Sequence, residues 1–292
     1  MACMKSICVF TPTYNRAYCL EDLFTSLKGQ DFADFHWLIV DDGSTDSTEA
    51  LVKTFQDAAP FPITYLKQEN GGKQRAFNVG VSHCTDELFF CVDSDDTLAP
   101  GALSALWSRW LEVRDDPKVA GLIGMDGKDA DTPLRTRIPD ELDKVTMWDL
   151  YYKHGHKGDT ALAHRTEILR EYPFWVAENE KFIAETYVFH QIDQKYTLGV
   201  VHEVLIVVEY REDGYSKNVR KITRDNPQGY AKLKRMYIEY ADTLYLKYYN
   251  TILYLVGCRL AGKRNAIADA PNKPLAILAY LPAWLLCKTV YR

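Results

Sequence analysis

Short apolar runs alternate with longer segments of helical periodicity along the amino-terminal part of the chain. Four runs, ICVF at 7–10, FHWLIV at 35–40, ITYL at 63–66 and LFFCV at 88–92, are rich in β-branched and aromatic residues. The segments between them carry apolar residues at helical spacing. Strands that alternate with helices are typical of βαβ units, so the pattern predicts an α/β domain with a mainly parallel central sheet.

Two of the intervening helices have start signals in the sequence. Asp46 precedes Glu49 by three residues, which is the spacing of a capping box, just ahead of the segment ALVKTF. Pro100 and Gly101 precede ALSALWSRWL, whose apolar residues have helical spacing. Both signals support the alternation of strands with helices.

Polar residues gather directly after each of the four predicted strands. The clusters are TPTYNR at 11–16, DDGSTD at 41–46, QENGGKQRAFN at 68–78 and DSDD at 93–96. In an open parallel sheet, ligands bind at the carboxyl ends of the strands, so the clusters are expected to converge on one crevice. The last cluster crowds Asp93, Asp95 and Asp96 together, and their repulsion calls for a cation or a hydrogen-bonded turn.

The individual motifs also have plainer interpretations. DDGSTD suits a turn followed by a helix cap, because Gly43 permits positive φ and Ser44 or Asp46 can cap. The GGK segment lacks the GxxxxGK[ST] spacing of a phosphate-binding loop, since Gln74 follows Lys73. DSDDTLAPGALS has Leu98 at the sixth position and Ser104 at the twelfth, where an EF-hand calcium loop has glycine and glutamate.

The four motifs, in this order and spacing, resemble family 2 of the inverting glycosyltransferases, whose nucleotide-sugar-binding α/β fold is called GT-A. The resemblance covers roughly residues 5–215. In that family an Asp-x-Asp motif binds a divalent metal and the diphosphate of the donor. The resemblance therefore implies that Asp95 is a metal ligand and that Asp93 reaches the metal or the ribose. The implied cofactor is Mn²⁺ or Mg²⁺, which neutralises charge on the leaving diphosphate.

The same resemblance implies further contacts to the donor. Pro12 and Tyr14 would line the nucleoside pocket, and Asp42 would accept a hydrogen bond from the nucleobase, which favours uracil and a UDP-sugar. Asn70 and Lys73 would contact the nucleobase and the phosphates. The chain departs from the family pattern at 76–78, where Ala-Phe-Asn replaces the frequent Ala-Arg-Asn, so Lys73 or Arg75 would supply the missing charge.

Inverting transfer needs a general base that takes the proton of the acceptor hydroxyl. The family often places a Glu-Asp pair there, and in the stretch ENEKFIAETYVFHQI at 178–192 the matching position is Ala184-Glu185. Glu185 is therefore the predicted base, with Glu178 and Glu180 as alternatives. A solvent-facing helix position without a catalytic role is the plainer interpretation of Glu185.

Two further stretches are expected to contribute to the site. The segment 155–174 lies where the family builds its acceptor side, and its candidate contacts are Asp159, His164 and Arg165. The charged loop EYREDGYSKN at 209–218 follows an apolar run at 204–208. A loop of this kind can close over the donor diphosphate.

The composition of the chain indicates the cellular compartment in which the protein is expected to fold. The 292-residue chain is 47% hydrophobic, as expected of a folded protein, and has a net charge of −5. Seven cysteines without a CxxC pair, together with no secretory signal, predict a reducing, cytoplasmic location. The apolar run Leu275–Cys287 is interrupted by Pro282 and falls short of the roughly 20 residues that span a bilayer.

The carboxyl-terminal region differs in charge and periodicity. Residues 211–292 hold 15 Lys and Arg against 6 Asp and Glu, which leaves 20 against 34 elsewhere from totals of 35 and 40. Apolar spacing between Tyr230 and Gly262 predicts one amphipathic helix rich in tyrosine. The last twenty residues, KPLAILAYLPAWLLCKTVYR, join an apolar body to basic flanks, which is typical of helices in the headgroup plane of an anionic membrane.

These features predict two domains, a glycosyltransferase catalytic domain at 1–225 and a membrane-associating helical tail at 226–292. For the tail, packing on the domain or on another subunit is the alternative. The predicted activity is metal-dependent, inverting sugar transfer, with the enzyme cytoplasmic and peripheral on the inner face of the cell membrane. The expected partners are a nucleotide-sugar donor, a glycan or lipid-linked acceptor of a bacterial surface polysaccharide, and an anionic membrane, with no nucleic acid.

Two other functions remain open at this point. A nucleotidyltransferase also uses carboxylate-held Mg²⁺ on an α/β sheet, but it would normally show a Gly-rich, basic loop where this chain has TPTYNR. A non-catalytic nucleotide-sugar-binding protein would make Glu185 dispensable. A donor screen that measures release of the nucleotide diphosphate separates these functions.

Overall fold

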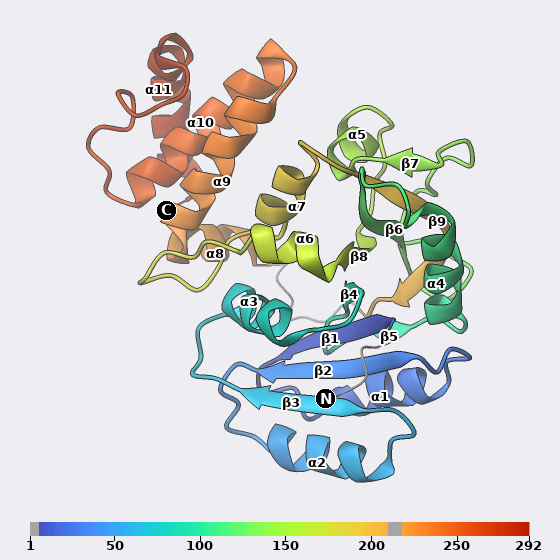
Figure 1. Ribbon diagram of the computed structural model, residues 1–292. Helices are drawn as coiled ribbons and strands as arrows, with labels where there is room; N and C mark the ends of the chain where they lie inside the picture. Colours follow the sequence, from blue (N-terminus) through green and yellow to red (C-terminus); the bar gives the residue numbers. More distant parts are fainter. Residues whose placement is uncertain (1–5, 210–217, 292) are drawn as a thin grey trace. The chain divides into compact units, whose positions relative to one another are not determined.

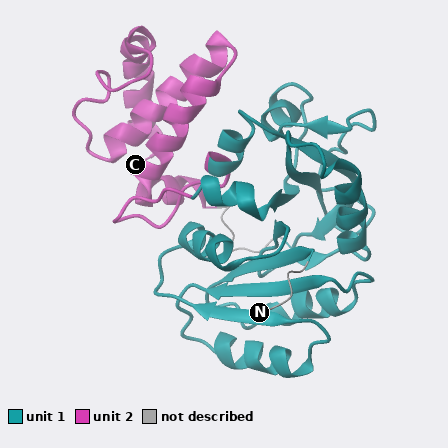
Figure 2. Ribbon diagram, viewed as in Figure 1, with its two compact units in different colours: residues 1–173, 188–209 teal, residues 174–187, 210–292 magenta. Residues whose placement is uncertain are grey.

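The computed structural model describes residues 6–209 and 218–291 (Figure 1). By their contacts, the residues of the chain divide into two compact units (Figure 2). The first unit takes in residues within 1–173 and 188–209, and the second takes in residues within 174–187 and 210–292.

The amino-terminal part of the first unit alternates strands with helices, as the hydrophobic pattern predicts (Figure 1). Its elements are β1 (Ile7–Thr13), α1 (Leu20–Lys28), β2 (Phe35–Asp41), α2 (Thr48–Ala58), β3 (Ile63–Lys67), α3 (Lys73–His83) and β4 (Leu88–Cys91). β1 pairs in parallel with β2 and with β4, and β2 pairs in parallel with β3. The four predicted strands and the predicted α/β class are therefore confirmed.

The later strands extend the same sheet and include antiparallel pairs. The elements are β5 (Thr97–Leu98), α4 (Ala102–Val113), β6 (Val119–Gly127), β7 (Lys144–Val145), α5 (Met147–Tyr152), β8 (Thr160–Arg165), α6 (Thr166–Glu171) and β9 (Thr197–Val207). β8 lies antiparallel between β4 and β6, and β9 runs parallel to β6. Across the described residues the strand order is β3-β2-β1-β4-β8-β6-β9-β5, with β7 on β9.

Aromatic side chains fill the core between α3 and the strands beneath it. Phe10 of β1 stacks on Phe89 of β4 with ring centroids 4.8 Å apart, and it meets Phe77 of α3 edge-on at 5.5 Å. Gly80 allows this close approach, because a Cβ at that position would lie 2.4 Å from Cε2 of Phe10. The amino end of α3, which begins at Lys73, is thereby held beside the strand ends.

The described part of the second unit is helical. Its helices are α8 (Val219–Asp225), α9 (Pro227–Tyr240), α10 (Leu244–Leu260) and α11 (Lys273–Thr289), and α7 (Thr186–Ile192) begins in this unit and ends in the first. The prediction of one helix from Tyr230 to Gly262 is wrong. Ala241 has extended backbone angles, and the Thr243 hydroxyl caps a new helix by accepting a hydrogen bond from the Leu246 N–H. The apolar spacing crosses the break because both helices face one shared core.

α11 packs on this core through a seam of small residues. Ala276, Ala279 and Ala283 are buried and belong to the same cluster as Leu255 and Val256 of α10. Among the described residues, no helix combines the length and the apolar character that crossing a membrane requires. The assignment of 226–292 as a membrane-associating tail stays a prediction.

Candidate functional site

Hydrogen bonds tie the loop after β1 to the loop after β2. The Asn15 N–H donates to the Ser44 hydroxyl at 2.8 Å, and the Asn15 side chain accepts from the Thr45 N–H at 2.8 Å. Asn15 adopts φ +53°, a left-handed conformation that asparagine tolerates better than most residues. The first two polar clusters therefore form one hydrogen-bonded edge of the site.

Asp46 takes part in the same edge, but it does not form the predicted capping box. α2 begins at Thr48, with Ser47 at the N-cap position. The Asp46 carboxylate accepts hydrogen bonds from the Thr48 N–H at 3.0 Å and from the Ala17 N–H at 3.1 Å. The capping-box prediction is wrong because Asp46 bridges the two loops instead of pairing with Glu49.

Asp42 organises the loop after β3. Its side chain is 4% exposed and accepts four hydrogen bonds from residues 68–72. One carboxylate oxygen accepts from the Gln68 amide at 2.7 Å and the Gly71 N–H at 2.8 Å. The other accepts from the Gly72 N–H at 2.8 Å and the Asn70 amide at 3.2 Å. Asp42 and Asn70 are thus brought together, and the predicted contact between Asp42 and the nucleobase stays a prediction.

Lys73 and Asp93 form an ion pair at the amino end of α3. The Lys73 Nζ lies 2.6 Å from one oxygen of the Asp93 carboxylate and 2.7 Å from the other. Gly72, which precedes the helix with φ +97°, turns the chain so that Lys73 becomes its first residue. The structure therefore joins the GGK motif to the DSDD motif.

Arg16 is a further member of the site that the sequence analysis did not assign. Its guanidinium lies 3.7 Å from the Asp95 carboxylate, and both side chains are partly buried. The signal was available, since Arg16 ends the polar cluster TPTYNR. Two neighbouring ion pairs, Lys73–Asp93 and Arg16–Asp95, thus join the loops after β1 and β4 to the first residue of α3.

The crowded carboxylates perturb one another. Burial raises the pKa of Asp95, the charge of Asp93 raises it further, and the charge of Arg16 opposes both effects. Burial, followed by the charges of Asp93 and Asp95, raises the pKa of Asp96 to about 8. The Asp96 N–H also donates to the Asp93 carbonyl at 3.1 Å, which closes the predicted turn. A bound cation would favour the charged form of these carboxylates and so oppose the raised pKa of Asp95 and Asp96.

The chemistry of this donor set fits a divalent cation. Asp93 and Asp95 offer hard carboxylate oxygens on partly exposed side chains, which suits Mn²⁺ or Mg²⁺ shared with phosphate oxygens. Within the described ranges, the one group of three close potential metal ligands is Cys8, Cys84 and Asp86, and it lies at the amino ends of β1 and β4. That group belongs to the buried core, so Asp93 and Asp95 remain the candidate ligands for the donor's metal.

The two residues assigned to the nucleoside pocket differ in exposure. Pro12 is a buried residue of β1 that pairs with Val40 of β2. Tyr14 follows directly after the strand and its side chain is 48% exposed. Tyr14 directly follows Thr13, whose carbonyl accepts a hydrogen bond from the Asp42 N–H at 2.8 Å. An exposed aromatic ring there can stack on a nucleobase, so Tyr14 is the better placed of the two for that role.

The three candidate bases lie in the second unit and have different surroundings. Glu185 is half-buried and directly precedes α7, while Glu178 is exposed. Glu180 is buried and accepts hydrogen bonds from the Gln228 N–H at 2.7 Å and the Gly229 N–H at 2.8 Å. Glu180 therefore caps the amino end of α9, which leaves its carboxylate committed to structure.

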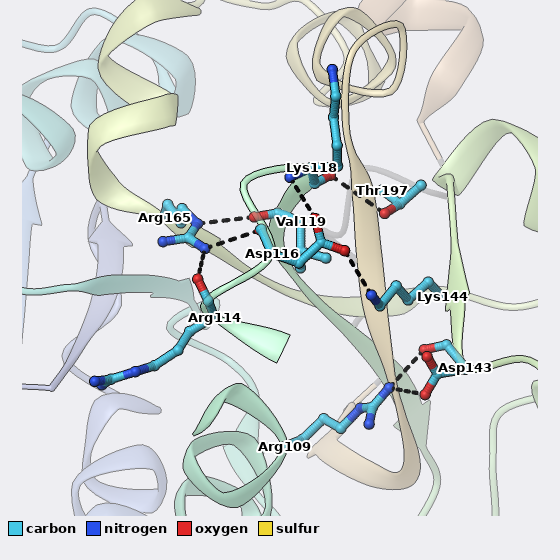
Figure 3. Close-up of polar contacts among 9 residues, drawn as sticks. All are labelled: Arg109, Arg114, Asp116, Lys118, Val119, Asp143, Lys144, Arg165 and Thr197. Atoms are coloured by element: carbon cyan, nitrogen blue, oxygen red, sulfur yellow. Dashed lines mark hydrogen bonds and ion pairs between the residues drawn. The ribbon is translucent and has the colours of Figure 1, made fainter. Parts of the chain in front are cut away.

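Two acceptor-side candidates from the sequence, His164 and Arg165, make their contacts inside the first unit. His164 is 2% exposed, stacks on Phe189 with centroids 5.0 Å apart, and has its pKa lowered to about 3 by burial. The Arg165 guanidinium donates to the Val119 carbonyl at 2.9 Å and to the Arg114 carbonyl (Figure 3). These contacts leave neither residue for a substrate. Asp159 is exposed. Most of the predicted loop at 209–218 lies outside the described residues.

Comparisons with known proteins agree with this geometry. Residues 8–171 match the family model described as glycosyl transferase family 2. GalNAc(5)-diNAcBac-PP-undecaprenol beta-1,3-glucosyltransferase of Campylobacter jejuni is 33% identical over 111 residues, which cover 36% of this chain and 35% of the relative. The chain spans about a third of the length of such curated relatives.

Solved structures show the fold. The chain resembles S. aureus TarS 1–349 with a TM-score of 0.59 and 18% identity, covering 98% of this chain and 93% of that one. TarS 1–349 is also known in complex with UDP and with UDP-GlcNAc. The mannosyltransferase PcManGT from Pyrobaculum calidifontis, in complex with GDP-Man and Mn²⁺, aligns with a TM-score of 0.56 and 20% identity, covering 100% and 83% of the two chains. The predicted GT-A fold is confirmed.

Proposed function

The chain belongs to glycosyl transferase family 2, and from this premise we propose that it transfers a sugar from a UDP-sugar to a glycan or lipid-linked acceptor with inversion at the anomeric carbon. The observation that carries the proposal is that two ion pairs, Lys73–Asp93 and Arg16–Asp95, lie close together at the strand ends. A diphosphate requires positive charge close by, and its metal requires carboxylate oxygen. This small region offers both.

The residues of the site have separate tasks in the proposed transfer. Tyr14 stacks on the nucleobase, while Asp42 holds the 68–72 loop against it. Lys73 and Arg16 place positive charge near the diphosphate, which lowers the energy of the charge that develops as the sugar leaves. Asp93 and Asp95 would hold Mn²⁺ or Mg²⁺, which supplies Lewis-acid stabilisation of the leaving diphosphate when bound.

Glu185 is the proposed general base. Its carboxylate takes the proton of the acceptor hydroxyl as that oxygen bonds to the anomeric carbon. The bond from this carbon to the diphosphate breaks on the opposite face, and the nucleotide diphosphate keeps the electron pair, so the configuration inverts. The cap that Glu180 forms on α9, and the exposure of Glu178, favour Glu185 among the three candidates.

A donor screen tests the reaction. Release of nucleotide diphosphate is measured from uridine, guanosine and thymidine donors, with and without Mn²⁺ or Mg²⁺ and with a candidate acceptor glycan. We expect UDP release that stops in chelator and returns when metal is added back. Asp95→Ala should abolish release, whereas Asp115→Ala, at a side chain that is 98% exposed, should not. Full activity in chelator would refute the metal assignment.

Two added measurements, pyrophosphate release from a nucleoside triphosphate and calorimetric binding of UDP-sugar, separate the alternatives. A nucleotidyltransferase would form a nucleotide-sugar and release pyrophosphate from a nucleoside triphosphate. A non-catalytic binding protein would bind UDP-sugar, as measured by isothermal titration calorimetry, without turnover on any acceptor. Either result would replace sugar transfer as the function.

Glu185→Gln tests the base. Because glutamine keeps the size and polarity but cannot take the proton, turnover should fall by roughly 10²- to 10⁴-fold while UDP affinity is unchanged. Glu178→Gln is the matched control and should turn over normally. Near-normal turnover of the Glu185 variant would move the role to another residue.

We place the reaction in the cytoplasm, at the inner face of the cell membrane, with a carrier-linked glycan as acceptor. Support comes from the Campylobacter jejuni relative, a glucosyltransferase named for a saccharide joined to PP-undecaprenol. Incubation with radiolabelled UDP-sugar and a membrane lipid extract tests this placement. We expect label in the organic-soluble fraction, and label only in water-soluble glycan would contradict a lipid-linked acceptor.

A further inference from the structure

α11 has two unlike faces, and one of them packs against its own unit. Ala276, Ala279 and Ala283 recur at three- and four-residue spacing and are buried in the cluster that includes α10. The Cys287 thiol on the same side lies 4.0 Å from the Val256 carbonyl of α10. Small side chains allow close approach of the two helices, so this face fixes how α11 is oriented on the second unit.

The opposite face is apolar and exposed. Successive helical residues are about 100° apart, so positions three, four or seven apart share a face. On α11 the face opposite the alanine seam presents four large hydrophobic side chains that are each between 48% and 66% exposed: Ile277, Leu278, Leu281 and Leu285. Contiguous exposed apolar side chains of this size mark an interaction surface. We call this set the α11 outer face.

Basic residues border the outer face. Lys273 is the first residue of the helix and Lys288 lies near its end, with the Lys288 Nζ 4.2 Å from the centroid of the Trp284 ring. The sequence of α11 contains no acidic residue. Residues 244–291 hold six Lys and Arg against one acidic residue, Asp269, a net charge of +5. The partner of this surface should therefore be both apolar and negatively charged.

The dimensions of α11 decide how it can meet such a partner. Its 17 residues extend about 25 Å at 1.5 Å per residue, which is shorter than the hydrocarbon core of a bilayer. One side of the helix is also occupied by α10 along the alanine seam. The helix can therefore lie along a membrane surface with its outer face toward the acyl chains.

We infer that α11 docks the protein onto an anionic membrane through its outer face, with Lys273 and Lys288 at the level of the lipid phosphates. The outer face supplies apolar burial, and the aromatic rings of Tyr280 and Trp284 suit the interface. In a symmetric contact a second copy of the chain would present the same basic flanks, so the charges favour lipid over pairing of two outer faces. This surface would supply the membrane contact that the placement proposed above requires. The surface is inferred from exposure and charge, and only its biological role rests on the proposed function.

Vesicle co-sedimentation of the full chain tests the docking without any transfer reaction. The probes are phosphatidylcholine vesicles with and without phosphatidylglycerol. We expect binding that rises with phosphatidylglycerol and falls with salt. Leu281→Glu should weaken binding by roughly tenfold or more, because an exposed leucine that would be buried among the acyl chains is replaced by a charge. Leu111→Glu, at an exposed leucine of α4 in the first unit, is the matched control and should bind as the wild type does.

Further variants separate the two contributions to binding. Lys273→Gln combined with Lys288→Gln should reduce binding to anionic vesicles and flatten the salt dependence. Far-ultraviolet circular dichroism should be unchanged in all variants, since the altered side chains are exposed.

The inference would be overturned if the wild-type protein does not bind anionic vesicles, or if Leu281→Glu binds them as well as the wild type does. A dimer in sedimentation velocity that Leu281→Glu dissociates, with no vesicle binding, would identify the outer face as a subunit interface instead. Because sugar transfer is not measured, failure here leaves the proposed chemistry standing.

Discussion

The substitution Asp42→Asn tests whether the Asp42 carboxylate anchors the loop at 68–72 or contacts the nucleobase. In the structure, the Asp42 carboxylate accepts four hydrogen bonds from residues 68–72, two on each oxygen. Asparagine keeps one oxygen and replaces the other with an NH₂ group, which is a donor. Whichever way the amide turns, two of the four donors of the loop lose their acceptor. The loop should then loosen even when no nucleotide is present.

The size of the effect follows from the bonds that are lost. Hydrogen bonds to a charged group contribute about 1.5–3 kcal/mol each, so two of them amount to roughly 3–6 kcal/mol. Water can reach part of this loop, since Asn70, Gly71 and Gly72 are only half-buried, and it will replace some of the loss. We therefore expect the free energy of unfolding to fall by about 2–4 kcal/mol.

Urea denaturation of the nucleotide-free protein measures this change. Asp57→Asn, at an exposed position of α2, is the control and should leave the free energy of unfolding unchanged. A second readout is hydrogen exchange, which should become faster at the amides of Gly71 and Gly72. If Asp42→Asn unfolds at the same urea concentration as wild type and only UDP affinity falls, the anchoring role is refuted and the nucleobase contact is favoured.

Three other predictions concern the scaffold around the site. Gly80→Ala should lower the free energy of unfolding by about 1–3 kcal/mol in urea denaturation, since its Cβ would lie 2.4 Å from Cε2 of Phe10. Glu180→Gln should cost about 1–3 kcal/mol by the same measurement, because the cap on α9 is weakened, yet sugar transfer should persist. Burial raises the pKa of Asp193 from 3.8 to about 7, so the stability it contributes is present at low pH and is lost as pH rises between these values. Asp193→Asn should therefore flatten the fall in thermal melting temperature over that range, and an unchanged slope would contradict this assignment.

The amino-terminal fold and the location of the site were predictable from local sequence. Runs of four to six β-branched and aromatic residues favour buried strands, and the first four strands form at those runs. Parallel strands bring their carboxyl ends to one edge, so the polar clusters after them had to approach one another. The residues Asp42, Asn70, Lys73 and Asp93 are joined for this reason.

Periodicity alone was not sufficient in the helical region. The apolar spacing between Tyr230 and Gly262 continues across the break at 241–243, because α9 and α10 send their apolar residues to one core. A hydrophobic pattern reports which side of a helix is buried, but it does not report where the chain turns back on itself. The sequence of α11 likewise does not show which side of the helix is buried, because that helix is apolar on both sides. Only its packing on α10 distinguishes the buried alanine seam from the exposed face.

The partners of the polar side chains were decided by tertiary structure. Lys73 and Asp93 are 20 residues apart, and Glu180 caps a helix that begins 47 residues later at Pro227, so no local pattern records either contact. His164 and Arg165 were plausible substrate contacts by composition, but the antiparallel position of β8 turns them into the core and toward backbone carbonyls. Local sequence determines which groups reach the strand ends, because propensity and periodicity act over a few residues. The register and order of the strands determine which of those groups meet, because such contacts join residues far apart along the chain.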